Sequence, residues 1–218
     1  MMPAGVAALG QNARPVNVRV QCVPQPASAY YGRDVDPVLV TDRLLARPWT
    51  LDEADLAAAY DVYARPEVAQ WIGAPMEPAE IRIRIERWSE PTTDPTYGVW
   101  AIEERSRPGR PIGSVLLRPL PPDEEDVEVG WHLHPAMWGR GYATEIGSAA
   151  ARRAFETGID EVFAIVRPGN DRSSQVARRL GMEYVGRTDK YWGLHAELFR
   201  LRPGDLLDLR DLRRYATR

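Results

Sequence analysis

The stretch that decides the fold of this chain is Trp138-Gly139-Arg140-Gly141-Tyr142-Ala143-Thr144-Glu145. Its glycines lack the side chains that would keep an anion away from the backbone. The residues that follow, 146–155, have helical spacing, and a helix start offers unpaired N–H groups and the positive end of the helix dipole. A pyrophosphate fits such a loop. By itself a Gly-x-Gly stretch is more typical of a tight turn, so its surroundings must decide between the two interpretations.

Strand and helix patterns lie on both sides of this loop. Upstream, strand-like runs separated by turn residues predict an antiparallel meander over 97–103, 112–117 and 127–133. Downstream, the patterns predict a buried strand over 162–166, a helix over about 173–180, and two last strands over 184–187 and 195–201. The predicted fold class is therefore α/β, with one mixed sheet.

Before the meander, the sequence predicts one strand followed by helices. The strand covers 38–47. Thr50-Leu51-Asp52-Glu53 forms a capping box, in which Thr50 caps a helix that runs to about Arg65. Pro66 and Pro78 each begin a further helical segment.

The predicted domain covers 37–202. Residues 1–36 mix Pro, Ala, Asn and Gln without a period and predict a flexible extension. Residues 203–218 form a tail whose Leu206, Leu209 and Leu212 predict a short amphipathic helix. Such a stripe packs on its own domain more often than it forms a dimer contact or covers a site.

Composition excludes several classes of protein. The chain has 218 residues and a formal net charge of −3, with acids and bases interspersed, so nucleic acid is not an expected ligand. No apolar run approaches the roughly 18 residues that a membrane helix needs, and the start is not a secretory signal. Cys22 is the only cysteine, which excludes an internal disulfide and suits a reducing cytoplasm. We therefore expect a soluble cytoplasmic protein.

Spacing separates the glycine loop from two other phosphate-binding motifs. In a dinucleotide-binding fold the acidic partner ends the next strand, whereas Asp160 and Glu161 precede the strand at 162–166. A kinase loop needs a lysine on a following strand, and Lys190, the only lysine, lies far away. What remains is a coenzyme whose pyrophosphate binds at the helix start and whose long arm runs beside a strand.

Residues 138–143 resemble motif A of the GNAT N-acetyltransferases, Gln/Arg-x-x-Gly-x-Gly/Ala, with Trp138 at its first position. A Trp there is typical of the branch that resembles the ribosomal-protein N-terminal acetyltransferases of RimJ/RimL type. Other hallmarks of that branch follow in the same order: Thr41-Asp42-Arg43-Leu44-Leu45-Ala46-Arg47, Glu128-Val129-Gly130-Trp131, Pro135, Asn170-Asp171-Arg172-Ser173 and Leu180-Gly181-Met182. The resemblance covers about Val38 to Leu201.

The resemblance implies the GNAT acyl-CoA N-acyltransferase fold, a mostly antiparallel sheet flanked by helices. Its central strands splay apart, so that the arm of acetyl-coenzyme A enters the gap like an added strand. The coenzyme-binding residues that it implies are Trp131, Leu133, Gly139, Arg140, Gly141, Tyr142, Ala143, Thr144 and Asn170. Gly141 should tolerate no side chain. Acetyl-coenzyme A is then the co-substrate, and no metal is required.

The implied reaction is direct attack of a neutral primary amine on the thioester in a ternary complex. Glu128 is the candidate base, and Ser173 is the candidate acid that protonates the departing thiolate. Each functional residue has an alternative interpretation: Glu128 as a solvent-facing strand residue, Ser173 as a helix N-cap, and Asn170 as a left-handed turn residue. The acceptor is a protein N-terminus or a small-molecule amine, and the resemblance also allows a homodimer.

Two other functions stay open. A non-catalytic coenzyme A-binding module would keep the loop but lack an effective base, and a longer acyl group could replace acetyl. His132 and His134 share a strand face and could hold a metal with His195. Strand histidines beside a groove are more often packing or hydrogen-bonding groups, so no metal is predicted.

Overall fold

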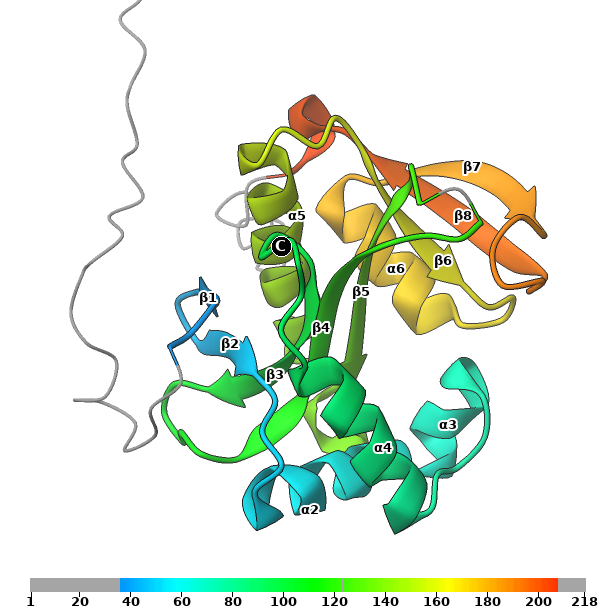
Figure 1. The fold of residues 1–218 in the computed structure, drawn as a ribbon. Helices are drawn as coiled ribbons and strands as arrows, with labels where there is room; N and C mark the ends of the chain where they lie inside the picture. Colours follow the sequence, from blue (N-terminus) through cyan, green and yellow to red (C-terminus); the bar gives the residue numbers. More distant parts are fainter. Residues whose placement is uncertain (1–35, 123, 208–218) are drawn as a thin grey trace, which may run out of the picture.

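The computed structural model describes residues 36–122 and 124–207. Their strands form an eight-stranded sheet in the order β1-β2-β3-β4-β5-β6-β8-β7 (Figure 1). The strands are β1 (Leu39–Val40), β2 (Leu44–Pro48), β3 (Gly98–Glu104), β4 (Pro111–Pro119), β5 (Val127–Leu133), β6 (Val162–Val166), β7 (Glu183–Thr188) and β8 (Ala196–Leu201). Neighbours are antiparallel except β5 and β6, which are parallel. The predicted mixed, mostly antiparallel sheet and its central meander are therefore confirmed.

Helices cover both faces of this sheet. They are α2 (Glu53–Tyr63), α3 (Pro66–Ile72), α4 (Pro78–Ser89), α5 (Tyr142–Glu156) and α6 (Asp171–Leu180). Successive residues of β3 show the two faces, because Trp100 and Ile102 join the core that contains α5 and α6, whereas Ala101 joins the core of α2, α3 and α4. Helices α2, α3 and α4 gather at the lower end of Figure 1. No helix within the described ranges is long and apolar enough to cross a membrane.

Strands β5 and β6 meet at one point and then separate. Within the described residues, their backbone pairing is limited to Glu128 opposite Phe163. On its other side β5 pairs with β4 from Val127 to Leu133, and β6 pairs with β8 over its whole length. Both central strands therefore have an open edge that faces the gap, where backbone groups can bind an extended ligand.

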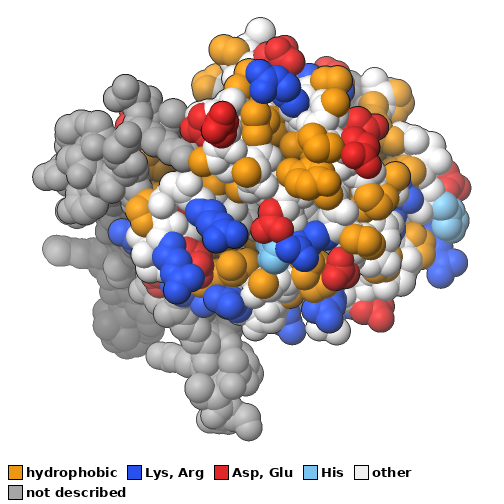
Figure 2. Space-filling view, turned by 90° about the horizontal axis from the view of Figure 1, so that it is seen from below, with side chains coloured by type: hydrophobic (Ala, Val, Ile, Leu, Met, Phe, Trp, Pro, Cys, Tyr) orange, Lys and Arg blue, Asp and Glu red, His pale blue; other side chains and the backbone are white. Residues whose placement is uncertain are grey.

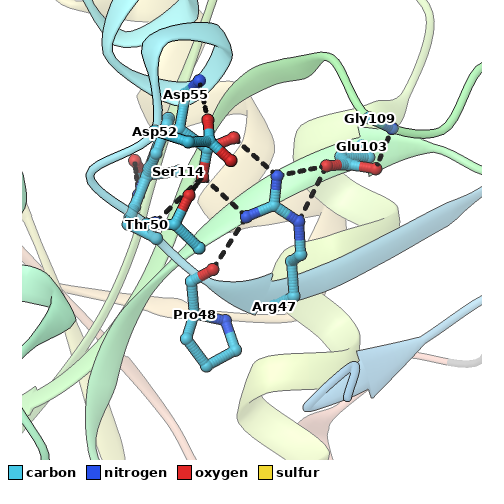
Figure 3. Close-up of polar contacts among 9 residues, drawn as sticks. Arg47, Pro48, Thr50, Asp52, Asp55, Glu103, Gly109 and Ser114 are labelled. Atoms are coloured by element: carbon cyan, nitrogen blue, oxygen red, sulfur yellow. Dashed lines mark hydrogen bonds and ion pairs between the residues drawn. The ribbon is translucent and has the colours of Figure 1, made fainter. Parts of the chain in front are cut away.

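A buried ion cluster joins β2, α2 and β3. Arg47, Asp55 and Glu103 are each at most 4% exposed. The Arg47 guanidinium donates to both carboxylate oxygens of Asp55, each at 2.7 Å, and its Nε donates to Glu103 Oε1 at 2.8 Å (Figure 3). The Thr50 N–H also donates to the Asp55 carboxylate, and the Gly109 N–H donates to the Glu103 carboxylate. Such full hydrogen bonding is what buried charges require.

Two expectations at the start of the domain are wrong. Residues 38–47 form not one strand but a hairpin, in which β1 folds back on β2 with Leu39 opposite Ala46. The cap of α2 is Asp52, whose side chain accepts from the Asp55 N–H, rather than Thr50. Thr50 instead donates its hydroxyl to the buried Asp55 carboxylate, because that charge needs several donors.

Two helices begin earlier than predicted. Helix α5 begins at Tyr142 rather than near Ile146, since Gly141 turns the chain directly into the helix. Helix α6 begins at Asp171, and its N-cap is Asn170, so Ser173 is not the cap. The interpretation of Asn170 as a left-handed residue is also wrong, because its φ is −83°.

The predicted N-terminal extension, apart from Asp36, and residues 208–218 of the tail lie outside the described residues. The described part of the tail is a 3-10 turn, Pro203–Asp205, followed by Leu206 and Leu207. Leu206 packs against the core, and the Leu207 N–H donates to the Leu180 carbonyl at 3.1 Å. The first tail residues therefore pack on their own domain.

Candidate functional site

A cavity of about 1180 Å³ opens where β5 and β6 separate. That volume is on the scale of sites for large organic ligands. Its walls include all the residues singled out from the sequence: Glu128, Trp131, Leu133, Gly139, Arg140, Gly141, Tyr142, Ala143, Thr144, Asn170 and Ser173. The fold thus brings together three separate stretches of chain, although the roles of these residues stay predictions.

The glycine loop enters α5 through two left-handed residues. Gly139 has φ 75° and Gly141, the N-cap, has φ 77°. No side chain of the described residues caps α5, so its first N–H groups face the cavity edge unpaired by a cap. A Cβ on Gly141 would lie 3.6 Å from Arg43 Nη2, an ordinary contact. Glycine is favoured here by its positive φ rather than by lack of space.

Arg43 and Glu145 brace this loop from the β1–β2 turn. The buried Glu145 carboxylate accepts from the Thr41 hydroxyl at 2.7 Å, the Arg43 N–H at 2.9 Å and Arg43 Nε at 2.7 Å. Arg43 Nη1 also donates to the Arg140 carbonyl at 3.0 Å. Burial alone would raise the pKa of Glu145, but these hydrogen bonds hold it below its usual range. Sequence reasoning quoted residues 41–47 as a motif without seeing this role.

Among the described residues, six arginines line the cavity: Arg43, Arg118, Arg140, Arg167, Arg172 and Arg179. Arg172, near the start of α6, lies over the Trp138 ring with its Cζ 4.8 Å from the ring centroid. The Trp138 indole in turn donates to the Leu133 carbonyl at 2.8 Å. Positive charge beside free N–H groups suits a ligand with several phosphates.

Glu128 lies at the point where β5 and β6 still pair. Its side chain is buried and lines the cavity, so its interpretation as a solvent-facing residue is wrong. Arg118 on β4 donates from Nε to Glu128 Oε2 at 2.8 Å. Burial raises the pKa of the Glu128 carboxyl, although the charge and hydrogen bond of Arg118 oppose this. A carboxylate with a raised pKa is a better proton acceptor than an exposed one.

Ser173 faces the cavity from the first turn of α6. Its N–H donates to Asn170 Oδ1 at 3.2 Å, so Asn170 holds the helix start. The Ser173 hydroxyl forms no hydrogen bond with any described residue. That hydroxyl is therefore free to bond a ligand, as a proton donor at this place must be.

A chain of polar groups not found from the sequence supports His132 on β5. Trp49 Nε1 donates to Ser114 Oγ at 3.2 Å, Ser114 Oγ and the Tyr63 hydroxyl are 2.5 Å apart, and Tyr63 lies 3.5 Å from His132 Nδ1. Trp49 can only donate, so each hydroxyl passes the hydrogen bond on: Ser114 donates to Tyr63, and Tyr63 donates to His132 Nδ1. The imidazole proton of His132 is then on Nε2. Burial, with the charges of Arg118 and Arg84, lowers the pKa of His132 to about 3. The ring is therefore neutral at pH 7.

The three histidines have different partners. His134 Nε2 lies 3.4 Å from Asp61 Oδ2, and His195 Nδ1 lies 2.7 Å from Asp189 Oδ1 at the surface. Across the described chain, no group of three or more His, Cys, Asp or Glu side chains is placed to hold a metal ion. Figure 2 shows acidic, basic and hydrophobic side chains intermingled on the face seen from below, without a stripe of one charge.

Comparison with known proteins gives one family. The family model described as an acetyltransferase (GNAT) domain matches residues 43–183. The chain is 27% identical over 158 residues to the uncharacterized N-acetyltransferase YoaA of Bacillus subtilis strain 168. That match covers 71% of this chain and 88% of YoaA.

Solved structures show the same fold. An acetyltransferase from Agrobacterium tumefaciens strain C58 is similar with a TM-score of 0.63 and 26% identity, over 77% of this chain and 95% of that one. RimL, a ribosomal L7/L12 alpha-N-protein acetyltransferase in complex with coenzyme A, is similar with a TM-score of 0.63 and 15% identity. It is matched over 77% of this chain and 98% of its own.

Proposed function

The chain belongs to the GNAT acetyltransferase family, and from that premise we propose that it transfers the acetyl group of acetyl-coenzyme A to a primary amine. The observation that carries this proposal is the cavity at the splay of β5 and β6. The same cavity contains an uncapped helix start, several arginines and the buried carboxylate of Glu128. Acetyl transfer needs both a coenzyme site and a base beside it.

The two ends of the cavity suit the two ends of the coenzyme. The N–H groups from Arg140 to Thr144 bind the pyrophosphate, and Arg140 adds positive charge. The pantetheine arm runs along the open edge of β5 and bonds the backbone near Trp131 and Leu133. Asn170 holds the start of α6 beside that arm.

Two side chains, Glu128 and Ser173, transfer protons in the proposed reaction. The Glu128 carboxylate, directly or through a water, takes a proton from the ammonium form of the acceptor, and the neutral nitrogen then attacks the acetyl carbonyl carbon. As the carbon–sulfur bond breaks, the Ser173 hydroxyl donates its proton to the departing thiolate, and the second proton lost by the nitrogen returns to Ser173 through solvent. A backbone N–H of the splayed β5, near Trp131, stabilises the oxyanion. The acetyl group goes directly to the amine, since Cys22 lies outside the proposed domain.

The acceptor class and setting are part of the proposal. Likeness to the RimJ/RimL branch favours the α-amine of a protein N-terminus, and a small-molecule amine is the alternative. We place the domain at 37–202 and the protein in the cytoplasm, which the single cysteine suits. A homodimer remains compatible with the family.

Thiol release from acetyl-coenzyme A, measured with and without a panel of primary amines, tests the proposal. We expect acceptor-dependent release, and Glu128→Gln should lower kcat by about 10²-fold while coenzyme binding is kept. A non-catalytic coenzyme A module would instead bind the coenzyme, release no thiol with any amine, and be indifferent to Glu128→Gln. Faster thiol release from a coenzyme A thioester with a longer acyl group would change the proposed donor and keep the proposed acyl transfer to an amine.

A further inference from the structure

We propose that the acceptor carries a carboxylate close to its amine, that Arg118 binds this carboxylate, and that the charge of Arg84 behind the cavity wall attracts it. The inference rests on the proposed acetyl transfer and narrows it to amino-acid-like acceptors. It comes from the part of the cavity wall that β4, β5 and α3 form.

Arg118 is held in a fixed orientation in this part of the cavity, where it can bind an anion. Its side chain is 42% exposed and lines the cavity. Glu128 holds its Nε from one side, and the Trp192 ring lies 4.7 Å from its Cζ. The terminal Nη1 and Nη2 groups form no hydrogen bond with the described residues. They are therefore available to a ligand in a fixed orientation.

Arg84 on α4 adds a second guanidinium beside the first. It is half-buried and forms no ion pair or hydrogen bond with the residues that the structure describes. Its Cζ lies 5.6 Å from the Trp88 ring, Trp88 packs edge-on against Tyr63 at 5.5 Å, and Tyr63 packs edge-on against His132 at 5.9 Å. Arg84 therefore lies behind the cavity wall, close enough for its charge to act on His132 and Arg118.

Charge at this wall is positive. Burial lowers the pKa of Arg84, and the nearby charge of Arg118 lowers it further. Glu80, one turn earlier on α4, is occupied at the helix start, where it accepts from the Glu77 N–H at 2.8 Å. Arg118 and Glu128 form an ion pair, and Arg84 and Arg87 add positive charge behind this wall. A carboxylate on the ligand is attracted here, whereas a group that is only cationic is repelled.

His132 and α3 complete the match. Neutral His132 directs a donor, Nε2–H, to the same wall, and a carboxylate or carbonyl oxygen can accept from it. Val68, Trp71 and Ile72 of α3 form an apolar surface next to it. Attraction of cations by the acidic turn is weakened, since Asp126 already bonds Lys190 and the Tyr191 hydroxyl. An α-amino acid with an apolar side chain has all the complementary groups.

A series of matched acceptors tests this inference on the whole protein. Each common apolar α-amino acid is compared with its amide, with the corresponding amine that lacks the carboxyl group, and with its aminophosphonate. The amide also represents the first residue of a peptide. Spermidine represents a cationic acceptor, and binding of acetyl-coenzyme A is measured separately. The readout is kcat/KM for acceptor-dependent thiol release.

We expect at least one amino acid to exceed its amide and its decarboxylated amine by about 10- to 100-fold, the range of a charge-assisted hydrogen bond. The phosphonate shows whether the site prefers carboxylate or phosphate geometry, and equal or better use of the phosphonate overturns the carboxylate assignment. Arg84→Gln should lower kcat/KM for the acid and, with it, the preference for acid over amide, the preference about tenfold. Arg82→Gln, exposed on the same helix, should change neither value.

Other results overturn the inference in distinguishable ways. Equal use of acid and amide, a preference for amines without a carboxylate, or an Arg84→Gln variant with the wild-type preference each contradict the carboxylate site but keep acetyl transfer. Coenzyme binding without turnover of any amine contradicts both the inference and the proposed function.

Discussion

Glu128 is the single residue whose ionisation the proposed reaction needs most. It must be deprotonated to accept a proton, so kcat/KM should rise with pH through its pKa. Burial raises that pKa above the usual glutamate range, and Arg118 opposes the rise. We therefore expect the acid limb of the pH–rate profile to lie above the ordinary carboxyl value. Arg118→Gln should move the limb to still higher pH, since it removes the opposing charge.

The matched control is Arg110→Gln, whose side chain is 82% exposed and does not pair with Glu128. It should leave the acid limb where it is in the wild type. If Arg118→Gln leaves the pH of the acid limb unchanged, the base is a group other than Glu128.

At the scale of elements, the brace between the β1–β2 turn and α5 holds the phosphate-binding loop. Glu145→Gln removes the charge that accepts from Thr41 and from Arg43. The free energy of unfolding should fall by about 2–3 kcal/mol, the scale of one or two charge-assisted hydrogen bonds, and the Kd for acetyl-coenzyme A should rise. Urea unfolding and calorimetric titration measure the two effects.

The difference in unfolding free energy between the wild type and Glu145→Gln should become smaller at acid pH. Because the pKa of Glu145 is lowered in the folded chain, its stabilisation is complete above the unfolded pKa and is lost as pH falls through the folded pKa. Glu156→Gln, exposed at the other end of α5, should stay within about 0.5 kcal/mol of the wild type. If both variants unfold alike, the brace contributes nothing.

The ion cluster between β2, α2 and β3 predicts a larger stability effect. Arg47→Met leaves the buried carboxylates of Asp55 and Glu103 without their cation, which should cost about 3–5 kcal/mol. Arg65→Met breaks a pair with Asp61 in which both side chains are about two-fifths exposed, and should cost less than about 1 kcal/mol. Thermal and urea unfolding compare the two, and equal costs would contradict a structural role for the cluster.

Most elements could be predicted because their patterns are local. Alternation and turn residues revealed the meander, and Gly181 correctly marked the end of α6. The β1–β2 hairpin was missed because Thr41-Asp42 carries no glycine turn signal and the strands are very short. The cap of α2 was misassigned because Thr50 is drawn to a carboxylate that only the folded chain places nearby.

At the scale of the whole molecule, the cavity depends on how distant segments meet. The loop, Asn170 and Ser173 could be found because they follow strands and begin helices, where ligands commonly bind. Glu128 and Ser173 received roles only through the family resemblance. Arg43, His132 and the Tyr63–Ser114 pair could not be assigned, because their partners lie between 51 and 102 residues away in the sequence. A single sequence carries no periodic signal for such pairs.

The most direct test of the account is thermal unfolding of the full chain with and without acetyl-coenzyme A. Ligand at about 100 times its Kd adds about 2.7 kcal/mol, which corresponds to roughly 5–10 °C in Tm for a chain of this size. Gly141→Asp should abolish the shift because it puts a negative charge at the phosphate-binding helix start. Gly158→Asp, at a glycine of similar φ beyond the other end of α5, should keep it. No shift in the folded wild type, or a full shift in Gly141→Asp, would contradict a coenzyme site at this loop.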